Sequence, residues 1–230
     1  MKELLNKKLL IGVTAKNGKG WKRKLKEIKK HNIQEFALFI EEIPLKKRQK
    51  LYKTLSKLKI KEIPLVHIKD DTTKEELKFF KEKFNTKYFT IHEDHFKVLT
   101  SWEGFTKDLY LEFDADNKIA SNVLVKKIGG FCVDLSHFKK AEERWAKEFE
   151  YILKKRGIKH YFGCNHLNGY SYKKNSDVHR VRDVSQFAYL FTLPNFVFGK
   201  IIALEMYNSI KQQLKYKEYL IPLLNKKFKE

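Results

Sequence analysis

Short runs of β-branched and aromatic residues alternate along this chain with longer amphipathic stretches rich in Lys and Glu. The short runs have the length of β-strands, and the longer stretches place their apolar residues at helical spacing. We predict eight strands, at residues 9–14, 35–40, 63–68, 87–92, 109–113, 130–135, 160–165 and 197–205. Helices are expected at 21–30, 46–58, 73–84, 138–156 and 209–228, the last kinked or broken at Pro222.

Strands that alternate with helices form parallel βαβ units. Eight such units close most naturally into a (β/α)8 or TIM barrel, an α/β fold. An open doubly wound sheet is the alternative, but it would not gather the ends of six strands around one point. We therefore predict a compact TIM barrel that forms a single domain over residues 1–230. The connection after His92 is the shortest and leaves little room for a regular helix.

The composition argues against a membrane-spanning, secreted or disulfide-bonded protein. No apolar run approaches the roughly 20 residues that a membrane span requires. The N-terminal MKELLNKKLLIGVTAK, with lysines among its apolar residues, does not resemble a secretory signal. Two cysteines, Cys132 and Cys164, cannot build a disulfide framework and are expected to be buried apolar thiols. We expect a cytoplasmic, monomeric protein without a membrane partner.

The net charge of +21 is concentrated in the first quarter of the chain. Residues 1–61 contain 19 basic and 5 acidic side chains. A basic face of this kind suits a polyanion such as DNA. Nearly all of these residues are Lys, however, and a Lys-rich composition also arises in genomes rich in A and T. Charge alone therefore leaves nucleic-acid binding and compositional bias equally open.

Nine His and acidic residues carry the chemistry that the sequence predicts. Most of them lie at or just past the end of a predicted strand, and they are His67, His92, Glu112, Asp134, His137, His166, Asp177, His179 and Glu205. A lone His in a strand is more often structural than a ligand, so the argument rests on their conjunction. Carboxylates buried at a barrel mouth are costly unless cations neutralise them. Nine ligands exceed the three or four that one zinc ion uses, so we predict a metal cluster, with His67 and Glu205 within about 15 Å of each other.

Three segments resemble the endonuclease IV type of apurinic/apyrimidinic endonuclease. They are FCVDLSHF at 131–138, CNHLNGYSYKKNSDVHR at 164–180 and ALE at 203–205. That family, within the xylose-isomerase-like TIM barrels, has a trinuclear zinc site. The resemblance implies that His67 and His92 hold one zinc and that Glu112 bridges it to a second. Asp134, His166 and Glu205 would complete the second zinc, and His137, Asp177 and His179 would hold the third.

The resemblance implies a base-excision DNA-repair enzyme that hydrolyses the backbone 5′ to abasic sites in double-stranded DNA and associates with the nucleoid. Three Zn²⁺ ions, which Mn²⁺ or Fe²⁺ can replace, would exceed the charge of the four carboxylates and leave +2 for a hydroxide and a phosphate. Glu112 and Glu205 are expected to be catalytic. We expect two loops to contact DNA through phosphate-binding and base-stacking side chains: Lys19, Trp21, Lys22 and Arg23 in the first, and Tyr170, Tyr172, Lys173 and Arg180 in the second.

Two other hypotheses remain. A sugar isomerase or epimerase of the xylose-isomerase-like group would need one metal, held by a set like Glu112, Asp134, His166 and Glu205. It would leave the other five candidate residues without a shared role, which favours the nuclease. A non-catalytic nucleic-acid-binding barrel is supported by charge alone, and an intact ligand set argues against it.

Overall fold

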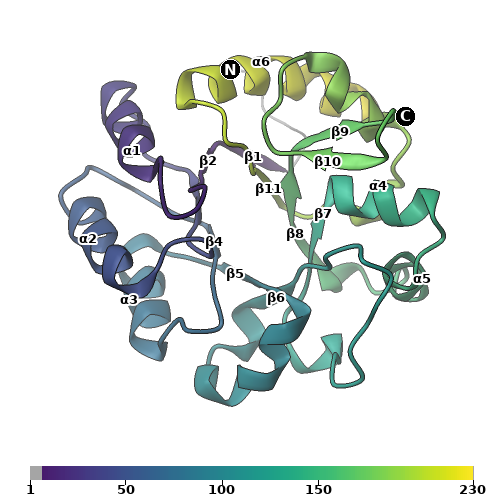
Figure 1. Cartoon of the computed structure of the whole chain (residues 1–230), viewed down its shortest axis with the longest axis horizontal. Helices are drawn as coiled ribbons and strands as arrows, with labels where there is room; N and C mark the ends of the chain where they lie inside the picture. The colour runs from purple at the N-terminus through teal and green to yellow at the C-terminus, as the bar shows by residue number, and fades with distance from the viewer. Residues whose placement is uncertain (1–6, 230) are drawn as a thin grey trace.

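The protein is a closed barrel of parallel strands ringed by helices, shown by a computed structural model that describes residues 7–229 (Figure 1). Residues 1–6 and 230, which the single-domain prediction includes, lie outside the described residues. The hydrogen-bonded order is β1 (Lys8–Leu10), β11 (Ile201–Leu204), β8 (Phe162–Leu167), β7 (Gly130–Asp134), β6 (Leu109–Leu111), β5 (Tyr88–Ile91), β4 (Leu65–His67), β3 (Ala37–Phe39) and β2 (Gly12–Val13).

The sheet closes because β1 and β2 are two halves of one strand, separated only by Ile11. The first half pairs with β11 and the second with β3, both in parallel. All eight predicted strands are present, so the TIM-barrel prediction is confirmed. Strand ends differ from the predicted bounds by a few residues, as is usual where the last residues of an element make no ladder hydrogen bonds.

Helices cover the outside of the barrel where the sequence predicts them, with α1 at Trp21–Lys30, α2 at Leu45–Leu55, α3 at Lys74–Phe84 and α6 at Ile210–Lys227. The predicted helix at 138–156 is wrong in one respect. It is divided into α4 (Leu135–Glu143) and α5 (Lys147–Lys154), because Trp145 adopts a left-handed φ of 51° between them. The predicted break at Pro222 is absent, since α6 continues through it with Leu220 and Leu224 buried on either side.

Short 3-10 segments replace regular helices in the remaining connections. They are η1 (Glu93–Trp102) and η2 (Thr106–Asp108) before β6, η3 (Val125–Lys127) before β7, η4 (Lys159–Tyr161) before β8, and η5 (Val184–Phe191) and η6 (Asn195–Val197) before β11. The segment after His92 therefore matches the prediction of little regular helix. A two-stranded hairpin, β9 (Gly169–Ser171) and β10 (Ser176–Val178), follows β8.

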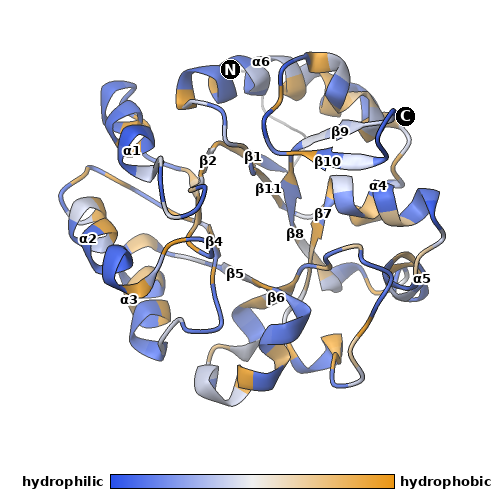
Figure 2. Cartoon of the chain, viewed as in Figure 1, coloured by the Kyte–Doolittle hydropathy of each residue, from blue (hydrophilic) through white to orange (hydrophobic). Residues whose placement is uncertain are grey.

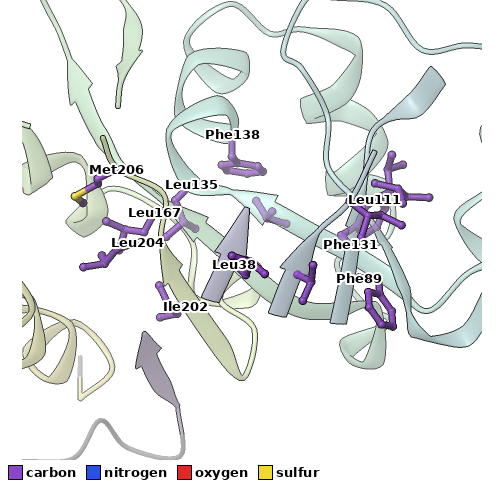
Figure 3. Close-up of a cluster of buried hydrophobic side chains, with 14 of the residues drawn as sticks. Leu38, Phe89, Leu111, Phe131, Leu135, Phe138, Leu167, Ile202, Leu204 and Met206 are labelled. Atoms are coloured by element: carbon purple, nitrogen blue, oxygen red, sulfur yellow. The ribbon is translucent and has the colours of Figure 1, made fainter. Parts of the chain in front are cut away.

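The core has two layers because alternate residues of each strand point to opposite faces of the sheet. The outer layer lies between strands and helices and includes Leu38, Phe89, Phe131 and Ile202 (Figure 3). The helices are polar on much of their surface and apolar where they meet the strands (Figure 2). The inner layer fills the barrel and contains Leu10, Ala37, Phe39, Leu65, Cys132, Cys164, Ile201 and Ala203. Both cysteines are buried free thiols, as predicted.

Strand alternation also determines what lies above this inner layer. Two residues beyond an inner-layer residue, the next side chain on the same face points into the barrel near its C-terminal mouth. His67 follows Leu65 in this way, Asp134 follows Cys132, His166 follows Cys164, and Glu205 follows Ala203. The same periodicity that fills the barrel therefore places polar side chains at its mouth.

Within residues 7–229, no helix combines the length and the apolarity needed to cross a bilayer.

The closure of the barrel depends on a glycine at the junction of its first and last strands. A Cβ on Gly12 would lie 1.9 Å from the backbone oxygen of Leu204 and 2.9 Å from the ring of Phe39. We expect Gly12→Ala to lower the free energy of unfolding by about 3 kcal/mol or more, since backbone on the next strand cannot move aside cheaply. Gly157→Ala is the matched control, because a Cβ there meets nothing within 4 Å. Equal urea midpoints for the two variants would show that closure of the barrel does not require the close packing of Gly12 against Leu204 and Phe39.

Candidate metal centre at the barrel mouth

Six of the nine predicted ligands lie at the C-terminal ends of six neighbouring strands. His67 ends β4, His92 follows β5, Glu112 follows β6, Asp134 ends β7, His166 lies in β8 and Glu205 follows β11. The parallel barrel brings these ends to one rim, which is where TIM-barrel enzymes hold their active sites. The structure therefore gathers residues that are up to 138 positions apart in the sequence.

Four of these side chains form a compact, fully buried group. One ligand atom from each of Glu112, Asp134, His166 and Glu205 lies within 4.8 Å of the others. Nδ1 of His166 is 2.9 Å from Oε2 of Glu112 and 3.3 Å from Oε2 of Glu205. We call these four residues the quartet. Three carboxylates and an imidazole at this spacing can hold one divalent cation.

His67 and His92 lie beside the quartet, with their rings 4.8 Å apart. His67 belongs to two close groups, one with His166 and Glu205 and one with His92 and Glu41. Ligand atoms of His67 and Glu205 therefore lie within 4.8 Å, far inside the separation of about 15 Å that a zinc cluster tolerates.

His137, Asp177 and His179 lie at the more open side of the mouth. His137 is in the first turn of α4, and its Nδ1 lies 3.0 Å from the Phe113 carbonyl oxygen. An Nδ1–H that donates to this carbonyl leaves the Nε2 lone pair free to bind a metal. Nδ1 of His179 is 3.1 Å from Oδ2 of Asp177, and its Nε2 is 3.8 Å from Oε2 of Glu205. Among residues 7–229, none of these three residues belongs to a close group of three or more ligand atoms, so the structure does not bring together the third zinc site that the resemblance implies.

Both carboxylate oxygens of Asp134 are held by hydrogen bonds from neighbouring residues. Oδ1 of Asp134 accepts hydrogen bonds from the backbone N–H groups of Ser136 and His137 at 2.8 Å, capping α4. Its Oδ2 accepts a hydrogen bond from Nδ2 of Asn168 at 3.0 Å. The Tyr189 hydroxyl donates to the Asn168 carbonyl. Asn168 was not predicted as part of the site; it lies two residues past His166, directly after the end of β8.

Buried atoms without hydrogen bonds show that these residues fit a cation. Both ring nitrogens of His67, Nδ1 of His166 and Oε2 of Glu112 are buried and make no hydrogen bond. They face other ligand atoms instead. Burial raises the pKa of Glu112, so its carboxylate is not readily formed without a positive charge nearby, and burial lowers the pKa of His67 well below its usual range, which favours the neutral imidazole that binds metals. A divalent cation between them would satisfy the lone pairs and stabilise the carboxylates.

A basic hollow of about 350 Å³ opens beside His179. The Tyr207 ring lines it and stacks on His179, with centroids 5.4 Å apart. The hollow is lined by Thr14, Lys16, Lys19, Gly20, Arg23, Lys24, Arg180 and Tyr207. Lys24 is buried, its Nζ bonded to Thr14 and to the Met206 carbonyl, and burial lowers its pKa to about 7. The exposed cations around it suit a phosphate group.

The predicted DNA-contacting residues divide into two groups. Lys19, Lys22, Arg23, Tyr172, Lys173 and Arg180 are exposed. Two aromatic predictions are wrong as stacking residues. Trp21 is 3% exposed because it begins α1 and packs into the outer core layer. Tyr170 is 2% exposed, and its hydroxyl donates to Asn175 while its ring packs on Tyr189.

Two carboxylates of the site were missed by the sequence analysis. Oε2 of Glu41 lies 3.1 Å from Nε2 of His67 and 3.3 Å from Nε2 of His92. Oδ1 of Asp114 lies 2.9 Å from Nδ1 of His92. A signal for Glu41 existed, since it follows the apolar segment FALFI just as Glu205 follows IIAL. Asp114 follows Phe113 in the loop after β6, and its sequence context carries no comparable signal.

Comparison with known proteins supports the fold and leaves the family open. No protein-family model matches the chain, and no curated protein matches it. Among solved structures, it is similar to one described as "Crystal structure of D-tagatose 3-epimerase-like protein", with a TM-score of 0.55 and 14% identity. The match covers 95% of this chain and 99% of that one. At this identity the likeness shows a shared barrel architecture, and the endonuclease IV resemblance is not confirmed.

The contact between Asp177 and His179 leads to a prediction for the pKa of His179, which can be measured without metal. Burial alone would lower the pKa of His179, but the hydrogen bond with Asp177 and the charges of Glu205 and Asp134 raise it to about 9. Any stability that this pair contributes is present below pH 6.5 and is lost as the pH rises through about 9. We expect NMR titration of chelated protein to give this pKa for the wild type and a lower one for Asp177→Asn. A His179 pKa that Asp177→Asn leaves unchanged would contradict the pairing.

Proposed function

We propose that this chain is a divalent-metal phosphodiesterase that incises DNA 5′ to abasic sites. The observation that carries the proposal is the surplus of candidate ligands over those one cation needs. The quartet alone can hold one ion, yet His67, His92, His137, Asp177 and His179 converge on the same mouth. A one-metal enzyme gives these five side chains no common purpose.

The close groups overlap, which supports more than one cation at adjoining positions. His67 is shared by two groups, and His166 and Glu205 belong to both the quartet and the group with His67. Glu205 also faces His179 at 3.8 Å. Cations at such positions would be only a few ångströms apart, the spacing used for phosphodiester hydrolysis at two-metal sites. Zinc suits this set of imidazoles and carboxylates.

When bound, these cations would supply a nucleophile from water near neutral pH and offset charge on the departing sugar oxygen. The chain's own residues would position the substrate. Oε2 of Glu112 and Oε2 of Glu205 both lie close to Nδ1 of His166, at 2.9 and 3.3 Å. Arg180, Lys16 and Arg23 in the basic hollow would hold phosphates next to the metals, and exposed Tyr172 and Lys173 would contact DNA farther out.

A sugar epimerase or isomerase is the second candidate, and the fold comparison favours it over the nuclease. The similar solved structure is described as D-tagatose 3-epimerase-like. The quartet would serve such an enzyme without further metals, with Glu112 and Glu205 as two carboxylates that remove and return a proton at one carbon. In that case, the basic hollow would accept a phosphate carried by the sugar.

The deciding experiment offers both substrates to the same purified protein. An abasic-site oligonucleotide duplex and a panel of ketoses, aldoses and their phosphates are incubated with metal-replete and chelated protein. We expect incision 5′ to the abasic site by replete protein only. Turnover of a sugar without incision of the DNA would contradict the nuclease hypothesis and support the epimerase hypothesis. Binding of the duplex with neither reaction would leave a non-catalytic DNA-binding barrel.

Substitution of Asp177 or His179, at the more open side of the mouth, distinguishes the nuclease hypothesis from the epimerase hypothesis further. We expect Asp177→Ala and His179→Ala each to lose about one metal per chain and to reduce incision by at least 100-fold, because a ligand shell of three cannot lose a member cheaply. Asp177 lies in β10 and His179 directly follows it, outside the barrel sheet, so circular dichroism should show an intact barrel. Full metal content together with a wild-type rate would contradict a third metal position.

Salt dependence tests the basic hollow. We expect DNA affinity to fall steeply with salt and Arg180→Ala to reduce the slope of log Kd against log salt by about 1, because one phosphate contact is lost. Arg156→Ala is the matched control. Arg156 is an equally exposed arginine in the segment that precedes β8, at the opposite end of the barrel. Equal slopes for the two variants, measured by fluorescence anisotropy, would remove the hollow from the DNA interface.

A further inference from the structure

We infer that Glu41, together with His67 and His92, forms a cation site distinct from the quartet, and that Asp114 and Glu112 orient its two imidazoles. This inference rests on the metal chemistry of the proposed function but departs from the ligand pattern that the endonuclease IV resemblance implies. In that pattern Glu112 would share the metal held by His67 and His92. Here Glu41, on the neighbouring strand connection, occupies the ligand position.

The distances fit direct coordination by Glu41. Its Oε2 lies 3.1 Å from Nε2 of His67 and 3.3 Å from Nε2 of His92. Ligand atoms about 2.0–2.1 Å from a tetrahedral zinc ion are about 3.3 Å from one another. The two distances from Glu41 therefore match edges of a zinc tetrahedron, and ligand atoms of all three residues lie within 4.8 Å of one another.

Both imidazoles present the same nitrogen to this position. Each turns Nε2 toward Glu41, and each has a different carboxylate beside Nδ1. Nδ1 of His92 is 2.9 Å from Oδ1 of Asp114, and Nδ1 of His67 is 3.6 Å from Oε2 of Glu112. A carboxylate at the far nitrogen of a metal-binding histidine fixes its tautomer and its ring orientation. His92 thus has the arrangement of a carboxylate–histidine–metal chain, and Glu112 lies on the corresponding side of His67 at a longer distance.

The burial of His67 between two carboxylates favours a bound cation over a simple ion pair at this position. His67 is 1% exposed, and neither of its nitrogens makes a hydrogen bond. A neutral imidazole has one proton, yet His67 has a carboxylate on each side. One nitrogen lone pair must then face a carboxylate oxygen, which is repulsive unless a cation or a proton lies between them. Zinc at Nε2 removes that repulsion and leaves the proton on Nδ1 for Glu112.

The test is the zinc content of the purified full-length protein, measured by mass spectrometry after equilibration with buffered Zn²⁺. We expect Glu41→Gln to lose about one equivalent relative to the wild type and to change the visible absorption of the Co²⁺-substituted protein. Asp94→Asn is the matched control, since Asp94 is an exposed carboxylate two residues from His92 that faces His95 and Lys97. It should retain the full zinc content and the wild-type Co²⁺ spectrum.

Asp114→Asn examines the orienting role separately. It should reach the same stoichiometry at saturating zinc but bind that equivalent about 10- to 100-fold more weakly in competition with a chelator. Thermal unfolding of all variants in chelator is measured in parallel, so that loss of zinc is not confused with loss of the fold. A Glu41→Gln protein that folds and keeps every equivalent with an unchanged spectrum would overturn the inference and reduce Glu41 to an ion-pair partner of His92.

Failure of the inference and failure of the proposed function give different results. If Glu41→Gln keeps all its zinc while the wild type incises abasic DNA, only the Glu41 site is wrong. If the wild type binds zinc through Glu41 but incises no DNA, the cation site stands and the nuclease function is wrong.

Discussion

The structure depends on a concentration of buried negative charge that the protein alone does not neutralise. Glu112 and Asp134 are 2% exposed and Glu205 is 5% exposed. Among the described residues, the ion-pair partners of Glu112 and Glu205 are histidines, which are charged only when protonated. Burying an unpaired charge costs several kcal/mol, so a mouth of this composition is favourable only with cations or protons bound in it. A bound metal ion would meet that requirement, and under the proposed function it would also supply the chemistry of the site.

The barrel makes this arrangement possible because its interior is filled below the mouth. Phe39 lies beneath the ligands, with its ring 4.9 Å from His166 and 6.0 Å from His67. Cys132 and Cys164 are one side-chain layer further down, at the positions that precede Asp134 and His166 on the same strand faces. An apolar floor lowers the local dielectric and strengthens every charge interaction above it. It also fixes the ring orientations that the ligand distances require.

One barrel scaffold is compatible with both of the reactions considered for this site, the hydrolysis of a phosphodiester and the epimerisation of a sugar. A TIM barrel supports many chemistries because its reactive groups come from strand ends and loops, while the fold comes from the layers below. The quartet is the part of the site that either reaction would use. The histidines beyond it, Glu41 and the basic hollow beside Tyr207 are the parts that distinguish a polynuclear phosphodiester site from a one-metal sugar site.

The sequence by itself determined the eight strands and most of the rim, because strand alternation and strand-end position are local properties. His67, Asp134, His166 and Glu205 each follow an apolar strand, so their convergence required only that the barrel close. The tertiary structure decided three further features: the burial of Trp21 and Tyr170, the division of the helix at Trp145, and the pairing of Asp114 with His92. Each depends on contacts between residues that are far apart in the sequence. An aromatic ring, for example, is buried or exposed according to its neighbours in space. The position of Glu41 between two imidazoles from other strands is of the same kind, because it depends on the parallel pairing of β3, β4 and β5 side by side in the sheet.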